Sequence, residues 1–479
     1  MFWRRRSSGD PLDRKLFHWP SGEPFTVRQL LDGGVSVIGR VGSGKTSSSG
    51  KHLGRAIVNH PNSCGLISAA KPEDVGMWRE IFAEAGRSED LLEFDADGDL
   101  RFNFLAEAMR HGGHTREITR CIITIAETLR SGDRGRGEDS AFWEREQERM
   151  IYNAVEVIKI ARKTVTAQDL QAFVTTAAYL PGQLREPTWR DGFHSRCLQT
   201  AYQTDKSPTE AQDFQLAADY WCSEIPNMAD RTRSSILTGV LGLLHVFNTG
   251  LVRELVSNGT NVSPDDMLDQ RKWVLVNLPP ASYGSAGTFI NAGWKYLTQR
   301  RVLRREARPG DPFHVCWVDE AQQFVNSFDG EYLAQCRSHL GCLVFLTQSL
   351  QSYFSALKGE GGKHQAKALL ANFGHRVVHA LGDIESANWA SALIGNRLET
   401  FLGGSMQPAQ SVFDELLGHQ QFSGNFSTKL EPVLQPSVFM NGLRTGGARN
   451  RFLCDAIVIK SGEPFASGQN WMRIAFSQR

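Results

Sequence analysis

Apolar residues along the chain gather in two regions of short runs, separated by a long region with a different pattern. In the first 104 residues, and again after about Lys272, short β-rich runs alternate with helical patterns. Because these runs show little alternation of polar and apolar positions, they predict strands covered on both faces, as in a parallel sheet. The predicted strands are Val35–Ile38, Gly65–Ser68, Leu91–Phe94, Trp273–Leu278, His314–Val318, Leu343–Thr347, Arg376–Ala380 and Ala456–Ile459.

Between residues 105 and 271 the apolar positions follow the spacing of helices instead. Ser207 and Glu210 form a capping box, with Pro208 at the first helical position. Thr166 is placed to cap a second helix, and apolar residues recur at three- and four-residue intervals behind both starts. This region is therefore predicted to be a helical block.

A helical block that interrupts alternating strands and helices predicts an α/β fold with a mostly parallel central sheet and an inserted all-α domain. We expect residues 1–104 to form the first part of the α/β domain, residues 105–271 the inserted domain, and residues 272–479 the second part. The length of 479 residues agrees with this division, because single domains usually contain about 100–200 residues.

A glycine-rich segment directly after the first predicted strand has the spacing GxxxxGK[ST] of a phosphate-binding loop. It consists of Gly39, Arg40, Val41, Gly42, Ser43, Gly44, Lys45 and Thr46. The glycines allow backbone N–H groups to turn toward phosphates, and the start of the following helix adds its dipole. Lys45 is then expected to contact the β- and γ-phosphates of ATP, and the Thr46 hydroxyl to bind Mg²⁺.

The apolar run Phe313–Val318 ends in Asp319 and Glu320, the pattern of a Walker B strand. Asp319 is expected to hold Mg²⁺ through water, and Glu320 to orient and polarise the attacking water. Gly39 and Asp319 stand about 280 residues apart, far more than a plain phosphate-loop domain requires. The helical block fills this gap, so motif spacing and composition predict the same insertion.

Two further residues are candidates for catalysis. Gln348 follows the next predicted strand, where its amide can sense the γ-phosphate or its water; a strand-end turn is the alternative. Arg337 precedes that strand and suits an arginine finger offered to a neighbouring subunit's nucleotide, because a guanidinium neutralises charge on transferring phosphoryl oxygens. The alternative for Arg337 is a solvated helix arginine.

Composition excludes several classes of protein. With 41% hydrophobic and 22% charged residues, the chain is not disordered, collagen-like or multispanning. The formal net charge of +1 means that any nucleic-acid surface must be local. The eight cysteines contain no CxxC pair, which is typical of reduced, buried residues. The longest uncharged stretch, Ser234–Val252, carries several polar residues, so we expect a core helix there and no transmembrane segment.

Taken together, these motifs resemble the type IV secretion coupling proteins, the conjugative DNA pumps of the TraG/TraD kind within the FtsK/HerA class of P-loop ATPases. The resemblance extends over nearly the whole chain from about Trp19. The residues that carry it are Gly42–Thr46, Lys71, Phe94-Asp95, Asn103-Phe104, Arg233–Ile236, Val318–Glu320, Arg337, Gly341, Gln348, Asn372, Asp383, Gly395, Leu443, Gly446-Gly447 and Ala456–Val458.

The resemblance implies a RecA-like ATPase domain that binds ATP and Mg²⁺ and assembles as a homohexamer. It also implies a central channel that passes DNA by its backbone without reading sequence, and an all-α domain that meets relaxase or adaptor proteins. The family usually has an N-terminal membrane anchor, whereas here only Met1–Arg6 precedes the domain. We therefore expect a cytoplasmic protein, or a peripheral one at the inner face of the cell membrane with a separate membrane-anchoring partner. Ala69 stands where the family often has an aspartate, which leaves the role of Lys71 open.

Two alternatives remain at this point. The first is a soluble HerA/FtsK-like DNA pump for packaging, processing or defence. The second is a nucleotide-gated docking receptor for secretion substrates that hydrolyses little ATP. Three groups of basic residues are candidate DNA contacts, with solvated helix ends or linkers as the alternative: Lys295 to Arg308, the loop Arg130–Glu138, and Arg444 with Arg449.

Overall fold

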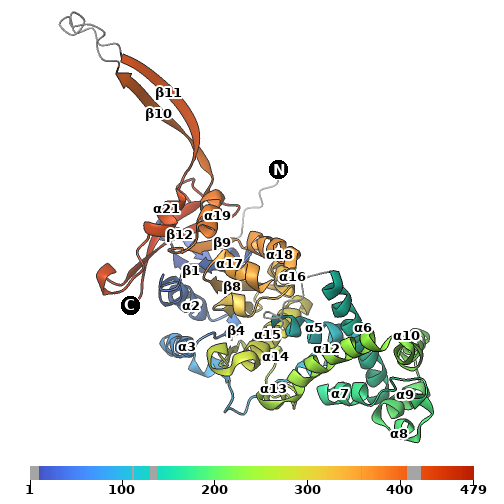
Figure 1. Ribbon diagram of the computed structural model, residues 1–479. Coiled ribbons are helices and arrows are strands. Elements are labelled where there is room, and N and C mark those ends of the chain that lie inside the picture. Colours follow the sequence, from blue (N-terminus) through green and yellow to red (C-terminus); the bar gives the residue numbers. More distant parts are fainter. Residues whose placement is uncertain (1–9, 111–112, 130–137, 358, 407–421) are drawn as a thin grey trace, which may run out of the picture.

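The computed structural model describes residues 10–110, 113–129, 138–357, 359–406 and 422–479. Its centre is a nine-stranded sheet in the order β13-β12-β9-β3-β8-β7-β4-β6-β5 (Figure 1). The strands from β9 to β5 are parallel, while β12 runs antiparallel to both β9 and β13. The nine strands are β3 (Val35–Ile38), β4 (Ser63–Ser68), β5 (Leu91–Phe94), β6 (Trp273–Val276), β7 (Phe313–Val318), β8 (Gly341–Thr347), β9 (His375–Val378), β12 (Leu453–Lys460) and β13 (Trp471–Ser477).

The predicted mostly parallel α/β fold is confirmed, and each of the eight predicted strands belongs to this sheet within a few residues of its expected bounds. The sequence pattern did not indicate β13. This edge strand alternates buried and exposed positions along its second half, and it lacks the continuous buried run of the central strands. The edge position therefore explains why the signal was weak.

Alternate residues of the central strands face two separate layers of core. Val37 of β3 packs in a cluster with Trp78 and other residues of α2 (Lys51–Val58) and α3 (Pro72–Glu84). Ile38, the next residue, belongs to the larger cluster on the opposite face, which includes α15 (Pro280–Arg304). Helices thus cover the sheet on both sides, as its continuous apolar strands require.

Between β5 and β6 the described chain consists of helices joined by loops and has no strand, apart from one isolated bridge between Phe102 and Thr260. The capping residues Ser207 and Thr166 are observed at the expected helix starts. The helices are α4 (Phe104–Arg110), α5 (Thr115–Leu129), α6 (Glu138–Arg162), α7 (Ala167–Thr175), α8 (Pro187–Arg190), α9 (Phe193–Gln203), α10 (Pro208–Asp219), α11 (Ile225–Asn227), α12 (Asp230–Asn248), α13 (Gly250–Val256) and α14 (Pro264–Gln270).

These helices share one core with the sheet. Phe102 and Trp294 of α15 pack with ring centroids 4.1 Å apart, and Trp294 also contacts Phe94 of β5 at 5.2 Å. The buried cluster on this face runs from the strands through α15 into α5, α6 and α12 without a break. The long helix α15 is therefore the element that joins the helical block to the sheet.

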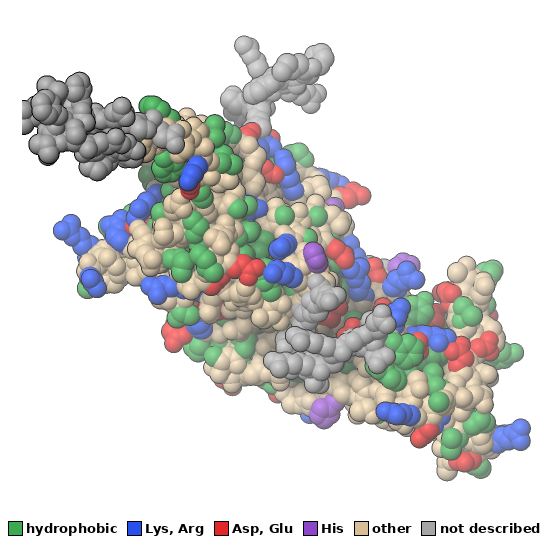
Figure 2. All heavy atoms as spheres, turned by 45° about the horizontal axis from the view of Figure 1, so that its top comes forward, with side chains coloured by type: hydrophobic (Ala, Val, Ile, Leu, Met, Phe, Trp, Pro, Cys, Tyr) green, Lys and Arg blue, Asp and Glu red, His purple; other side chains and the backbone are tan. Residues whose placement is uncertain are grey.

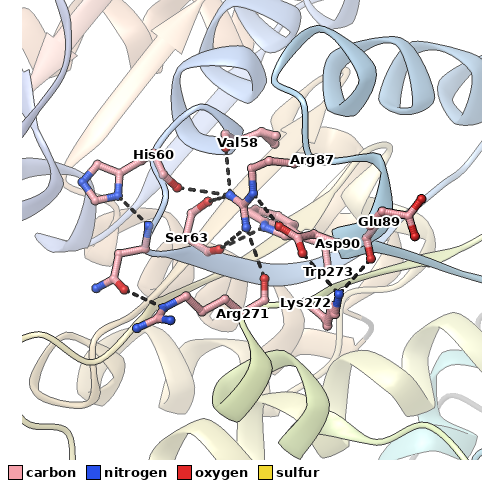
Figure 3. Close-up of polar contacts among 10 residues, drawn as sticks. Val58, His60, Ser63, Arg87, Glu89, Asp90, Arg271, Lys272 and Trp273 are labelled. Carbon is pink, nitrogen blue, oxygen red and sulfur yellow. Dashed lines mark hydrogen bonds and ion pairs between the residues drawn. The ribbon is translucent and has the colours of Figure 1, made fainter.

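The chain re-enters the sheet at Arg271–Trp273, and Arg87 fixes this point (Figure 3). The Arg87 guanidinium donates to the carbonyl oxygens of Val58, Ser63 and Arg271 at 2.8–3.2 Å, and its Nε donates to Asp90 at 2.8 Å. One side chain thus holds the end of α2, the start of β4 and the return from α14 together. The carbonyls that converge there are satisfied by its donors.

The remaining strands form two small separate sheets, β1-β2 and β10-β11. A hairpin of β10 and β11 projects far from the body (Figure 1). The other elements are β1 (Lys15–His18), β2 (Pro24–Thr26), α1 (Val27–Leu31), α16 (Phe328–Gln335), α17 (Leu350–Ala356), α18 (Gly359–Asn372), α19 (Ile384–Ile394), β10 (Asn396–Met406), β11 (Phe422–Pro432) and α21 (Pro436–Asn441).

Among the described residues no single helix is long and apolar enough to cross a membrane. The pair α12 and α13 meets the length and composition criteria only together, and the two helices meet at an angle of 66°.

Candidate nucleotide-binding site

The glycine-rich loop between β3 and α2 has the conformation that its sequence requires. Gly42 and Gly44 have φ angles of 74° and 83°, in the left-handed region that favours glycine. A Cβ on Gly44 would lie 2.2 Å from Cys454 Sγ, so the loop also packs too closely there for a side chain. Residues Thr46–Gly50 continue as a π-helical turn into α2. The loop and the helix start are thus arranged as in a phosphate cradle.

Parallel strands bring the separate motifs to one edge of the sheet. Ile38 of β3 pairs with Thr347 of β8, and Val318 of β7 pairs with Phe345 of β8. The carboxyl ends of these three strands therefore lie side by side, and the residues that follow them meet. Ligands of open parallel sheets bind outside this edge.

The buried carboxylate of Glu320 is the centre of the site. Its Oε1 accepts from Lys45 Nζ at 3.3 Å and from Lys71 Nζ at 2.8 Å, while its Oε2 accepts from Gln322 Nε2 at 2.8 Å and Gln348 Nε2 at 2.9 Å. Glu320 is 1% exposed and has a φ angle of 45°, an uncommon conformation for a residue other than glycine. Backbone strain of this kind clusters at functional sites.

Charge and hydrogen bonds keep Glu320 ionised. Burial alone would raise the pKa of this carboxyl, but the charge of Lys45 and the hydrogen bonds from Lys71, Gln322 and Gln348 lower the pKa to about 2. A carboxylate with four donors accepts hydrogen bonds and gives none. A water molecule can therefore be polarised by Glu320 only after one of these donors moves away, as Lys45 would on binding phosphates.

The neighbouring residue Asp319 faces the loop. Its Oδ2 accepts from the Thr46 hydroxyl at 2.8 Å, and its Oδ1 accepts from the backbone N–H of Glu320 at 2.7 Å. Burial raises the pKa of Asp319, although the charge of Lys45 opposes this. Two oxygen ligands of the type that Mg²⁺ prefers therefore lie within hydrogen-bond distance of each other, beside the phosphate loop.

Besides Gln348, two members of this site lie outside the phosphate-loop and Walker B motifs. Gln322 was not among the predicted site residues; its amide oxygen accepts from the Thr347 hydroxyl at 2.9 Å, which aims its N–H₂ at Glu320. A polar residue two positions after the paired acids was the only available signal. Lys71 contacts Glu320 even though Ala69 replaces the aspartate usual in coupling proteins. The Asp74 side chain accepts from the backbone N–H of Lys71 at 3.1 Å and fixes this turn.

Arg337 is not part of this cluster within one chain. It lies in the short helix η8 (Cys336–His339), just before β8 begins, and β8 runs parallel to β3. Arg337 is therefore at the opposite edge of the sheet, about 20 Å from the phosphate loop for a seven-residue strand. Its Nη1 pairs with Asp32 Oδ1 at 2.7 Å, and both side chains are more than half exposed.

Most of the predicted basic clusters are neutralised within the described chain. Lys295 is fully buried and paired with Asp329, Arg300 and Arg304 pair with Glu117, and Arg301 pairs with Asp265. Arg444 donates to both carboxylate oxygens of Asp455. The candidate loop Arg130–Glu138 and the terminal residues Met1–Arg6 lie outside the described residues, apart from Glu138 at the start of α6.

Comparison with known proteins finds similarity in structure and not in sequence. No protein-family model and no curated protein matches the chain. Among solved structures, the bacterial conjugative coupling protein TrwBdeltaN70 in its unbound monoclinic form superposes with a TM-score of 0.62 at 13% identity, covering 99% of this chain and 90% of that one.

Two further structures of the plasmid coupling protein TrwB give the same result. The complex with the ATP analogue ADPNP has a TM-score of 0.61 at 13% identity, covering 99% of this chain and 92% of its own. The complex with the GTP analogue GDPNP has a TM-score of 0.61 at 14% identity, covering 98% and 92%. Because the likeness spans nearly the whole chain, this protein has the fold of a type IV coupling protein-like P-loop ATPase, with a mostly parallel RecA-like sheet and an all-α region.

Proposed function

We propose that this protein is a Mg²⁺-dependent ATPase that drives DNA, alone or with bound protein, into a type IV secretion or conjugation-like machine. The observation that carries the proposal is the convergence of Lys45, Lys71 and Gln348 on the buried carboxylate of Glu320, beside the phosphate loop. This arrangement combines nucleotide binding with a group that can activate water. The presence of both Glu320 and Gln348 favours hydrolysis over simple nucleotide-gated docking, because a pure switch could lose either residue.

In this proposal the loop Gly39–Thr46 binds the triphosphate. Lys45, which contacts Glu320 at 3.3 Å, turns to the β- and γ-phosphate oxygens. Thr46 and Asp319 hold Mg²⁺, which neutralises the charge that develops on the phosphates. Their oxygens lie 2.8 Å apart. Burial raises the pKa of Asp319, and a bound cation would stabilise the ionised carboxylate, so these residues fit the ion.

Glu320 and Gln348 act on the attacking water. The carboxylate of Glu320 accepts a hydrogen bond from the water and orients it toward the γ-phosphorus, while the Gln348 amide holds the water or the γ-phosphate in line. Gln322 keeps one oxygen of Glu320 in place at 2.8 Å. These residues all follow strands that end at the same edge of the sheet, so water reaches Glu320 once Lys45 has turned to the phosphates.

Arg337 completes the site of a neighbouring subunit. It lies at the edge opposite its own phosphate loop, where it pairs with the exposed Asp32. An exposed pair of this kind contributes about 0–1 kcal/mol, so Arg337 is readily released to an incoming nucleotide. Such a head-to-tail contact can close into a ring, and we propose a homohexamer.

DNA is proposed to pass through the ring and to be gripped by its phosphates without base readout, which makes binding strongly dependent on salt. The helical block is proposed to receive relaxase or adaptor proteins, and the protein to act in the cytoplasm or at the inner face of the membrane beside an anchoring partner. The likeness to TrwB supports this role, because TrwB is a bacterial conjugative coupling protein. A soluble DNA pump for packaging, processing or defence would use the same ATP-hydrolysing site.

Steady-state ATPase activity, measured with and without DNA, tests this proposal. We expect Lys45→Ala to abolish nucleotide binding, and Glu320→Gln to bind ATP normally while turnover falls at least about 100-fold, a typical loss for one group that acts in the transition state. Lys51→Gln is the matched control, because Lys51 pairs with Glu80 on the surface at 3.0 Å and lies outside the site. If both site variants retain wild-type turnover, the assigned site is wrong. If ATP promotes binding of protein substrates without DNA-stimulated turnover, the protein is a docking receptor.

A further inference from the structure

The projecting hairpin has one apolar and one charged face. In the register of β10 and β11, Leu398 lies opposite Leu430, Thr400 opposite Thr428, and Leu402 opposite Phe426. Because side chains alternate across a strand, these three pairs share one face. On the opposite face, Arg397 lies in register with Glu431, and Glu399 with Lys429. Phe401 is the next residue of β10 on that face.

The apolar face is open to solvent. Leu398, Leu402, Phe426 and Leu430 are 63–77% exposed, among the most exposed large apolar residues of the described chain. Hydrophobic side chains gather on the hairpin where it comes forward beside the grey atoms at the upper left of Figure 2. A contiguous apolar patch of this kind on a soluble protein marks an interaction surface.

The two strands also lack further strand partners in the part of the chain that the structure describes. They form a separate two-stranded sheet, so both outer edges present backbone N–H and C=O groups over 11 residues. Proteins normally protect long edges of this kind, and a lone two-stranded ribbon is marginally stable in water. Both the apolar face and the edges therefore suit a partner made of protein, which can cover side chains and pair with backbone.

Charge argues against DNA or an anionic lipid surface as that partner. The described charged residues of the hairpin are Arg397, Lys429, Glu399 and Glu431. Their charges sum to zero, and Arg397 forms an ion pair with Glu399 on the same strand. Phosphate-rich partners are recognised by an excess of Lys and Arg. The hairpin offers apolar area instead.

The position of the hairpin's root shows which edge of the sheet the hairpin starts from. The carbonyl of Leu393, at the end of α19, accepts from Asn470 Nδ2 at 3.0 Å, and Asn470 lies beside Lys460, which pairs with His375 at the start of β9. The root is therefore at the edge where the parallel strands begin, which is also the edge that bears Arg337. Three strand spacings, about 14 Å, separate β12 from β8 along this edge.

We propose that the apolar face of the hairpin docks on a second copy of this chain, the neighbour whose nucleotide site faces Arg337. The proposal rests on the proposed ring. A strand of 11 residues extends about 37 Å, so the hairpin is long enough to contact a subunit that lies against the Arg337 edge.

The size of the hairpin defines its contribution. A two-stranded ribbon of this length, about 10 Å wide, presents about 370 Å² on one face. A stable interface usually needs about 800 Å² from each partner. The hairpin is therefore an addition to the main subunit contact and strengthens an interface that includes Arg337, rather than forming the whole of it.

The experiment measures self-association of the full chain by sedimentation velocity over a dilution series, with ADP and Mg²⁺ present. The variant Leu402→Ser/Phe426→Ser removes one cross-strand pair from the apolar face. Phe401→Ser is the control, since Phe401 lies on the opposite face, with Lys429 Nζ 5.8 Å from its ring. We expect the double variant to weaken association at least about tenfold, and the control to leave it within about twofold, because a buried apolar side chain contributes more than about 1.4 kcal/mol. These side chains are exposed, so the melting temperature of the dissociated chain should not change.

Hydrogen exchange provides the second measurement. In the wild type, the amides of residues 396–403 and 426–432 should become protected as the chain associates. Unchanged association in the double variant together with unprotected amides overturns the proposal. Flotation with phosphatidylcholine vesicles that is lost in the double variant also overturns it, because the partner would then be lipid. Nucleotide binding is followed in parallel, so a failed ATPase assignment is distinguished from a failed docking surface.

Discussion

Removal of Lys71 should slow ATP hydrolysis without weakening ATP binding. Lys71 Nζ lies 2.8 Å from Glu320 Oε1, whereas Lys45 is needed by the phosphates once a nucleotide is bound. Lys71 then becomes the cation that remains in contact with Glu320 among the described residues. We expect it to hold the carboxylate in place while water is activated, as a positioning residue.

The size of the effect follows from the exposure of the pair. Two unit charges at the 2.8 Å separation of this pair interact by about 1.5 kcal/mol in water, and by about 6 kcal/mol at an effective dielectric constant near 20. The Lys71 side chain is 50% exposed and the Glu320 side chain only 2%, so solvent screens the pair toward the lower value. A loss of about 1–2 kcal/mol corresponds to a decrease in kcat of about 5- to 30-fold.

The assay is steady-state hydrolysis of Mg²⁺-ATP by Lys71→Gln in the presence of DNA. We expect a lower kcat with the KM for ATP within about twofold of the wild type, because the interaction acts on the chemical step and not on binding. Lys51→Gln again serves as the control, because it removes a lysine–carboxylate pair that lies outside the site. An unchanged kcat would refute the positioning role, and a higher kcat would mean that Lys71 restrains Glu320.

Four further outcomes are expected. Thr46→Ala should raise the Mg²⁺ concentration required for half-maximal ATPase activity at least about tenfold, since Thr46 supplies one of two protein oxygens; an unchanged Mg²⁺ titration would contradict this. Arg337→Ala and Lys45→Ala should each be nearly inactive alone, yet mixed subunits should regain activity, because each supplies what the other lacks; a mixture as inactive as its components argues against a shared site. Gly44→Ala should weaken nucleotide binding, as seen by calorimetry, because a Cβ would meet Cys454 Sγ at 2.2 Å. Burial, aided by the charge of Asp265, raises the pKa of Glu107 to about 7, so the stability that its protonated form contributes is complete at low pH and is lost as the pH rises from about 4.5 to 7. Glu107→Gln should therefore stabilise the chain by about 3 kcal/mol at pH ~8 and little at pH ~4, by denaturant titration.

Most residues that meet in the candidate site could be proposed from the sequence, because their expected chemistry depends on local sequence. Gly42 and Gly44 adopt φ angles that other residues avoid, and Asp319 and Glu320 directly follow a buried strand. Each therefore gives a recognisable sequence pattern within a few positions. The meeting of these segments required only that their strands be parallel neighbours. Gln322 gave no such pattern, because its role depends on a hydrogen bond from Thr347, 25 residues later.

The hairpin and the pairing of the basic clusters were beyond the reach of sequence patterns for a different reason. β10 and β11 carry Gly, Ser and Thr among their apolar residues. The two strands do not pack against a core, so they lack the continuous apolar run that predicted the central strands. Lys295 does not contribute to a basic patch, because it is buried and Asp329, 34 residues later, pairs with it. Charge counted along a chain does not record which carboxylate will lie beside it.

The packing of Trp294 against Phe94 and Phe102 has a consequence for how the molecule unfolds. The helical block contributes side chains to the same apolar core as the strands. Removing it would therefore expose one side of α15 to solvent. The helices between β5 and β6 therefore pack as an integral layer of the α/β fold rather than as a detachable part. Heating should unfold both parts in a single calorimetric transition. A force applied to the outer helices should be transmitted to the sheet.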